Sequence, residues 1–282
     1  MNKNIYRVSL LIALGLSSLG SAQAASISLL SPGAAYTQDF DTLDDFTGST
    51  TNVALPSGWA IFEDGTSART NQAYGVDAGS NNAGDTYSYG AAGSTDRALG
   101  SLRSGTLIST FGAEFINNTG ASISRLDIAF TGELWRLGTA SRTDKLTFQY
   151  STDASSLTTG TYLDFSALDF VTPNTTGPGA KNGNDAANAM AISATIAGLD
   201  IAALSSFWIR WSDIDASGAD DGLAIDDFSL AARGAVVPAA LTVPEPGSLA
   251  LAGIALVGLL TTRRLRIRAI STRAMARSTP ST

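Results

Sequence analysis

The sequence predicts an all-β protein: an antiparallel β-sandwich of jelly-roll type, flanked by an N-terminal signal peptide and a C-terminal single hydrophobic helix. Apolar residues between residues 25 and 233 alternate with polar ones, which is typical of half-buried strands. Clusters of Gly, Asn, Ser, Thr and Pro separate these runs, and none of the runs has a convincing helical period. About ten short strands with such punctuation favour a sandwich or a jelly roll.

The first 24 residues are typical of a secretory signal peptide. Lys3 and Arg7 precede an apolar run at residues 8–19, and the small residues at 22–24 form a cleavage site. We therefore expect cleavage after Ala24 and export of the remaining chain.

The body of the chain, residues 25–233, is predicted to form one sandwich domain. Alternation is clearest at residues 126–130, 146–150 and 207–211. The other predicted strands span residues 58–64, 85–90, 97–104, 107–117, 162–170, 189–197 and 222–231. Two long loops are expected at 76–95 and 172–188, and residues 234–242 are expected to form a linker.

The C-terminal region carries the most specific motif of the chain. A Val-Pro-Glu-Pro sequence precedes an apolar segment at residues 247–262 and a basic cluster. Proline prevents helix and sheet here, so the motif is an extended, accessible peptide. About 16 apolar residues span roughly 24 Å as a helix, which suits a membrane anchor with snorkelling flanks. The motif residues are Val243, Pro244, Glu245, Pro246, Arg263 and Arg264.

This arrangement at residues 243–268 resembles the PEP-CTERM sorting signal. The resemblance implies recognition by an exosortase-type membrane protease, with 247–262 as a transient inner-membrane anchor and release to the cell surface or exterior. The basic cluster places the C-terminus on the cytoplasmic side. The chain departs from the family because it continues past that cluster, and residues 269–282 are predicted to be a basic cytoplasmic tail. An ordinary retained anchor is the alternative.

The composition excludes several kinds of chemistry. The chain has 282 residues with no Cys and no His, so it has no disulfide framework, thiolate nucleophile or Ser-His-Asp relay. Residues 25–242 hold 24 acids and 10 bases, a net charge of −14. Because an acidic body repels phosphate backbones, nucleic acid is not an expected partner.

An acidic cluster at residues 213–222 supplies candidate ligands for Ca²⁺. Its D-x-D-x-S-G start places oxygen atoms at alternating positions and ends on a turn-forming Gly. It is not an EF-hand, because Ala224 stands where a bidentate Glu is needed. An acidic, solvated hairpin turn is the alternative. The candidate ligands are Asp213, Asp215, Ser217, Asp220 and Asp226.

Two adjacent carboxylates interrupt the predicted strand at 222–231. Strict alternation places Ile225 on the same face as Asp227, and Asp226 on the same face as Phe228. At least one carboxylate then lies beside apolar side chains, where it needs Arg, backbone N–H groups or a cation as partner. This run resembles the closing strand of jelly-roll modules in extracellular adhesion and carbohydrate-binding proteins, and the resemblance implies fold rather than activity.

Tryptophan side chains are candidates for stacking on sugar rings. Trp211 shares a face with apolar neighbours and is expected in the core, whereas Trp208 points to the opposite face. Trp135 is the second candidate, with a covered sandwich face as the alternative.

These features predict an exported protein of the cell surface or extracellular matrix. It is expected to be a non-catalytic, polysaccharide-associated module with a binding or a structural role. Ca²⁺ is the only candidate cofactor, and no catalytic residue is assigned. The alternative is a hydrolase of such polymers that uses a carboxylate pair such as Glu114 and Glu133.

Overall fold

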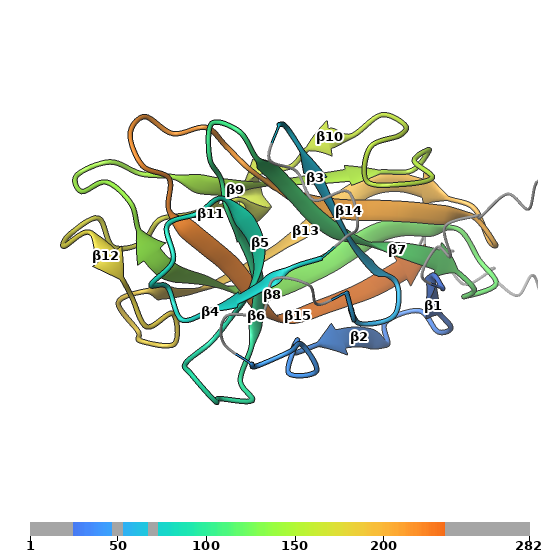
Figure 1. Ribbon diagram of the computed structural model, residues 1–282. Coiled ribbons are helices and arrows are strands. Elements are labelled where there is room, and N and C mark those ends of the chain that lie inside the picture. The colour runs from blue at the N-terminus through green and yellow to red at the C-terminus, as the bar shows by residue number, and fades with distance from the viewer. Residues whose placement is uncertain (1–24, 47–52, 67–72, 235–282) are drawn as a thin grey trace, which may run out of the picture. The chain divides into compact units, whose positions relative to one another are not determined.

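Two β-sheets face each other across one apolar layer in the computed structural model (Figure 1). The structure describes residues 25–46, 53–66 and 73–234, which all belong to one compact unit. The predicted signal peptide, linker, sorting motif, hydrophobic helix and basic tail lie outside these residues. Within them, no helix has the length and apolar character needed to span a membrane.

Sheet A has the strand order β1-β7-β14-β9-β10, with β3 also paired to β7 and β11 also paired to β9. Its strands are β1 (Ile27–Leu29), β3 (Trp59–Asp64), β7 (Ile108–Asn117), β9 (Lys145–Ser151), β10 (Leu163–Asp164), β11 (Phe170–Val171) and β14 (Ser206–Asp213). A short 3₁₀ turn, η1 (Ser166–Leu168), separates β10 from β11.

Sheet B has the order β12-β8-β15-β6-β5-β4, with β13 also paired to β8 and β2 also paired to β15. Its strands are β2 (Ala35–Gln38), β4 (Gly75–Asp77), β5 (Asp85–Tyr89), β6 (Ala98–Leu102), β8 (Ile123–Leu137), β12 (Gly179–Ala180), β13 (Ala189–Ile201) and β15 (Gly222–Gly234).

The longer strands change sheet at nearly every step along the chain. The path runs from β7 in sheet A to β8 in sheet B and β9 in sheet A, and later from β13 to β14 to β15 in the same alternation. This connectivity is that of a jelly roll, so the predicted all-β sandwich is confirmed. Two short pairs, β1 with β7 and β4 with β5, are parallel, which corrects the expectation of a wholly antiparallel fold.

Nine of the ten predicted strands each correspond to one strand of the structure. The exception is the run at 162–170, which η1 divides into β10 and β11. The 76–95 loop contains β5, and the short strands β1, β2, β4 and β12 were not predicted. Strands of two to four residues give too few alternations to be distinguished from loop sequence.

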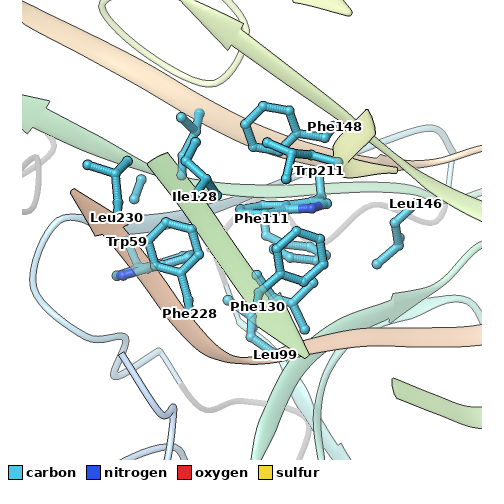
Figure 2. Close-up of a cluster of buried hydrophobic side chains, with 14 of the residues drawn as sticks. Trp59, Leu99, Phe111, Ile128, Phe130, Leu146, Phe148, Trp211, Phe228 and Leu230 are labelled. Atoms are coloured by element: carbon cyan, nitrogen blue, oxygen red, sulfur yellow. The ribbon is translucent and has the colours of Figure 1, made fainter. Parts of the chain in front are cut away.

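The core forms because alternate side chains of both sheets point inward. Trp211 of β14 is fully buried and stacks on Phe111 of β7 with ring centroids 5.9 Å apart. From sheet B, Phe130 meets the same indole edge-on at 5.3 Å (Figure 2). Burial of each such aromatic ring stabilises the fold by roughly 2–3 kcal/mol. The prediction that Trp211 belongs to the core is confirmed.

A β-bulge in β15 corrects the predicted faces of this strand. Against β8, the pairing advances from Asp226↔Thr131 to Ser229↔Ala129, so β15 contains one extra residue. Ile225 and Phe228 therefore both face the core, although strict alternation would separate them. Asp226 is buried on the other face at 5% exposure, and Asp227 is exposed. As the sequence requires, buried Asp226 has a partner: the backbone N–H of Asp227, at 2.7 Å.

Candidate functional site

A polar hollow of about 650 Å³ opens where the end of β2 meets the bulge of β15. Three segments line it: β2 with the turn that follows, the turn before β3, and the bulge. Six of the lining side chains carry hydroxyl, amide or carboxylate groups, and two are apolar. The lining residues are Thr37, Gln38, Asp39, Thr42, Pro56, Ser57, Asp227 and Phe228.

The bulge brings Asp227 to this hollow. Its φ of 48° lies in the left-handed region, and its N–H donates to the carboxylate of Asp226. Short polar side chains such as Asp tolerate this region better than most because they bond locally to the backbone. The turned backbone leaves the Asp227 carboxylate exposed at the hollow while Phe228 fills the core below it.

Phe40 shapes another wall of the hollow in a similar way. It also has a left-handed φ, 57°, and its fully buried ring meets Trp59 edge-on with centroids 4.7 Å apart. Its carbonyl accepts the N–H of Leu43 at 2.9 Å, which closes the turn. Phe40 thus anchors the turn whose residues Asp39 and Thr42 line the hollow.

Left-handed non-glycine residues gather at the hollow. The described residues contain four of them: Phe40, Ser141, Leu204 and Asp227. One lines the hollow and another anchors its wall. Such conformations cost about 1–3 kcal/mol each and cluster at functional sites, so their presence here points to a functional role.

Hydrogen bonds from the core fix the orientation of Gln38. The indole N–H of Trp59 donates to Tyr36 Oη at 3.0 Å, and Tyr36 Oη donates to Gln38 Oε1 at 3.2 Å. Burial raises the pKa of Tyr36, so this phenol keeps its proton at neutral pH. Two successive hydrogen bonds from the core therefore hold the amide oxygen of Gln38 in place.

The lining has the chemistry needed to hold a ligand rich in hydroxyl groups. Hydroxyl and amide side chains both donate and accept hydrogen bonds, while Asp39 and Asp227 accept them. Half-buried Pro56 adds apolar surface, whereas Phe228 is fully buried and supports the hollow from the core. Two carboxylates favour neutral or cationic groups and disfavour anions.

Trp135 lies on the outer face of sheet B but is covered, with 2% of its surface exposed. Its indole stacks on Tyr89 at 6.1 Å and donates its N–H to Glu133 Oε2 at 2.8 Å. The 172–188 loop covers the ring, because a Cβ at Gly183 would lie 2.4 Å from its atoms. Of the two alternatives for this residue, the covered face is the one observed.

Trp208, the other candidate for sugar stacking, is also buried, at 3% exposure. It points to the outer face of sheet A as predicted, but packs there with Leu157 and Tyr162. Arg210 holds the same loop, lying 3.6 Å over the Tyr162 ring and bonding to the Leu157 carbonyl. A role for Trp135 or Trp208 in sugar binding stays a prediction that these positions do not support.

The five candidate calcium ligands are not brought together. Asp213 is buried, with Oδ2 accepting from Ser101 Oγ at 3.2 Å, whereas Asp226 lies with Glu133 on the outer face of sheet B. Asp215 and Ser217 are exposed. The described ranges contain no group of three or more acidic side chains that could hold a metal ion. Calcium binding therefore stays a prediction without a coordination site.

Arginine side chains supply the positive charge beside the 213–221 acids. Arg142 lies 3.1 Å from Asp144 and 3.5 Å from Asp221, and both carboxylates are buried. Asp220 accepts the N–H of Ala216 at 3.1 Å, and burial raises its pKa to about 6. The predicted solvated turn is thus partly an internal ion-pair network.

The suggested carboxylate pair of Glu114 and Glu133 is not formed, because Glu114 lies beside Trp208 on the outer face of sheet A and Glu133 beside Trp135 on the outer face of sheet B. Instead Glu133 and Asp226 share the outer face of neighbouring strands, where register places Glu133 opposite Ala224 and Asp226 opposite Thr131. Burial raises the pKa of Glu133 to about 7 and that of Asp226 to about 8. Both are less than 7% exposed, and neither lines the hollow.

Sequence reasoning missed every lining residue of the hollow. The available signal was the Asp226-Asp227 pair in the middle of an apolar strand, since two consecutive carboxylates fit a bulge better than a regular ladder. The segments 40–43 and 55–59 also contain lining residues, but their proximity depends on strand pairing that spacing alone does not show.

Comparison with protein families finds the PEP-CTERM protein-sorting motif at residues 242–265. The chain therefore carries this sorting motif, and its resemblance to the family is confirmed over that segment. No curated protein matches the chain.

Several solved structures are similar in fold to part of the chain. The CBM22-1 xylan-binding domain from Paenibacillus barcinonensis has 10% identity and a TM-score of 0.36, over 73% of this chain and 99% of that one. An adhesin domain of Lys-gingipain from Porphyromonas gingivalis has 12% identity and a TM-score of 0.39, over 72% and 100%. TmCBM61 in complex with β-1,4-galactotriose has 14% identity and a TM-score of 0.34, over 62% and 88%. Similarity of this degree assigns no function.

Proposed function

We propose that this protein is an exported, non-catalytic module that binds extracellular polysaccharide through the hollow between β2 and the β15 bulge. The proposal rests on the lining itself: six hydroxyl, amide and carboxylate side chains beside half-buried Pro56. Phe40 and Asp227 adopt left-handed backbone conformations in the segments that form the hollow, and such conformations are unfavourable for residues other than glycine.

The sorting motif supports the proposed location. A PEP-CTERM motif at 242–265 suits export, with residues 247–262 as a transient inner-membrane anchor and an exosortase-type protease as processing partner. The sandwich would then act at the cell surface or in the surrounding matrix, where polysaccharide is the abundant ligand.

The negative charge of the hollow and of the domain restricts which sugars can bind. The hollow has Asp39 and Asp227 in its lining and belongs to a body whose residues 25–242 carry a net charge of −14. Anionic polymers such as uronates would be repelled at short and long range. The proposed ligands are therefore neutral or amino sugars.

Burial of the acidic pair supports binding rather than hydrolysis. A glycosidase needs two carboxyl groups that flank the scissile bond. Glu133 and Asp226 are covered, at 3% and 5% exposure, and lie outside the hollow. A hydrolase would release reducing ends over time, and loss of that release in Glu133→Gln would favour the alternative.

Calorimetric titration of residues 25–234 with neutral, amino-sugar and uronate oligosaccharides tests the proposal. Asp227→Asn and Gln38→Ala should each weaken binding by about 5- to 20-fold, because each removes a hydrogen-bonding group from the lining. Asp164→Asn is the matched control, since it removes an exposed acid from β10 in the other sheet.

Parallel titrations in Ca²⁺ and in EDTA, with Asp220→Asn, test the proposed cofactor separately. Loss of binding in EDTA together with loss in Asp220→Asn would assign a ligand role to the 213–221 segment. The hollow would be refuted as the binding site if Asp227→Asn and Gln38→Ala both bound sugar with the affinity of the wild type. It would also be refuted if the protein bound none of the three sugar classes.

A further inference from the structure

Strand β13 lies at an edge of sheet B, where β8 is its strand partner and the 3₁₀ turn η1 packs near it. Among the described residues it pairs only with β8, in continuous register from Ala189↔Glu133 to Ala197↔Arg125. The backbone groups that point away from β8 form no ladder with any other described strand. Nine paired residues at about 3.3 Å each give a straight edge roughly 30 Å long.

The edge lacks the usual protection against pairing with another chain. Natural edge strands are short, carry Lys or Pro, or are distorted by bulges. The run at 189–199 contains no charged residue and no proline, and Asp200 follows only after the irregularity between Ala197 and Ile201.

The other described edges differ from β13. Strands β1 and β4 have three residues each, β2 has four, and β10, β11 and β12 have two each, while β3 ends on Glu63 and Asp64. A short edge strand offers few unpaired backbone groups to a second strand, and charged side chains on an edge disfavour pairing. The absence of protection is thus specific to β13 within the described ranges.

The β13 edge is held in an extended conformation. Ile192 and Ile196 point into the core, at 9% and 1% exposure, and fix the strand to the sandwich. On the outer face, Thr195 donates to Asp127 at 2.8 Å, and Asp127 in turn is paired with Arg233 at 2.7 Å. The edge is therefore ordered in advance, so pairing with a second strand costs little conformational entropy.

We propose that β13 pairs antiparallel with β13 of a second copy of this chain, so that two sandwiches share one continuous sheet across a two-fold axis near Ser193. About that axis the facing pairs are Ile192 with Ala194, Ala191 with Thr195, and Met190 with Ile196. Each pair joins uncharged side chains, most often a larger one with a smaller one, so no like charges meet.

Charge selects a second copy over other occupants. An extended basic peptide would be drawn to carboxylates, but the 189–199 edge presents none. A strand that carries acidic side chains would find no cationic partner along this edge. An uncharged strand of the same sequence meets neither difficulty at the contact, and the long-range repulsion between two acidic bodies falls with salt. Dimerisation should therefore strengthen as ionic strength rises from about 10 mM to 150 mM.

Cysteine cross-linking in the full-length protein tests the pairing directly, because the natural chain has no Cys. Residues opposite each other in an antiparallel pair have Cα atoms about 4.5–5.5 Å apart, within reach of a disulfide. Single variants Ala191→Cys, Ser193→Cys and Ala197→Cys, with Thr158→Cys on an exposed loop as control, are expressed and exported. We expect a disulfide-linked dimer at 193, and none at 191, 197 or 158, because in this register residues 191 and 197 do not face their own copies.

Light scattering of residues 25–234 gives an independent readout. Ser193→Lys should shift the dimer to monomer because two ammonium groups would meet at the axis, whereas Ser193→Thr should leave it unchanged. Circular dichroism confirms that each variant is folded. Monomeric wild-type protein at about 100 µM in 150 mM salt, or cross-linking no stronger at 193 than at 158, would overturn the proposal. Neither outcome concerns the sugar hollow, which is tested separately.

Discussion

At the scale of single residues, Gly183 is required because the covering loop passes directly over Trp135. A Cβ at this position would lie 2.4 Å from two atoms of the indole ring, closer than real side-chain contacts allow. The ring cannot withdraw easily, since it stacks on Tyr89 and donates to Glu133.

We therefore expect Gly183→Ala to lower the free energy of unfolding by about 1–3 kcal/mol, through overpacking. For a domain of this size, that loss corresponds to a decrease in Tm of roughly 3–10 °C. Thermal denaturation followed by circular dichroism measures it. Gly105→Ala is the control, because a Cβ there meets nothing within 4 Å. Equal Tm values for the two variants would show that the loop does not press on the indole.

At the scale of the strand, Asp227 has two roles in the bulge of β15: its backbone adopts the left-handed turn, and its carboxylate is proposed to bind sugar. Two substitutions distinguish these roles. A β-branched residue is strained at a φ of 48°, whereas glycine is not. Asp227→Val should destabilise the domain by about 1–2 kcal/mol, while Asp227→Gly should leave its stability within about 1 kcal/mol of wild type.

Both substitutions should nevertheless weaken sugar binding, because both remove the carboxylate. Chemical denaturation and calorimetric titration on the same preparations distinguish the two effects. If Asp227→Gly bound sugar as tightly as the wild type, the bulge would be structural and the carboxylate unimportant.

Sequence alone predicted the elements whose pattern is regular. Alternation identified β8, β9 and β14, and it placed Trp211 correctly in the core. The same rule failed at Asp226 and Asp227, because one extra residue inverts every later face of a strand. The hollow was missed for this reason, since it depends on that inversion.

Burial of the candidate sugar-binding tryptophans depends on distant segments. Alternation showed that Trp208 points away from the core, but the loop carrying Leu157 covers it. Trp135 is covered by the loop at Gly183, almost fifty residues later in the chain. Periodicity reports which face a side chain takes, not whether another segment lies over that face.

At the scale of the whole molecule, buried acids should make the stability of this protein fall as pH rises. Glu133 and Asp226 have pKa values raised to about 7 and about 8, chiefly by burial. The charged groups near them are Asp96 and Asp227, which are also acids, so no positive charge offsets their ionisation. Burial likewise raises the pKa values of Asp213, Asp220 and Asp221.

The direction of the effect follows from proton linkage. In the unfolded chain these carboxyls lose their protons near pH 4, whereas in the folded protein Glu133 and Asp226 keep theirs until about pH 7–8. Between those limits the folded state binds more protons, so stability declines with rising pH. Over pH 5 to pH 8 this amounts to roughly 2 pH units for Glu133 and about 2.5 for Asp226, at about 1.4 kcal/mol per pH unit, so the expected loss is on the order of 6 kcal/mol.

Urea denaturation of residues 25–234 at intervals from pH 5 to pH 8.5 measures this decline. Asp226→Asn should flatten it, because the amide keeps the volume of the carboxyl and cannot ionise. Asp164→Asn, an exposed acid in the other sheet, should leave the slope unchanged. A wild-type stability that is constant or rises over this range would mean that Glu133 and Asp226 are solvated or neutralised in solution, and that the outer face of sheet B is more open than its packing indicates.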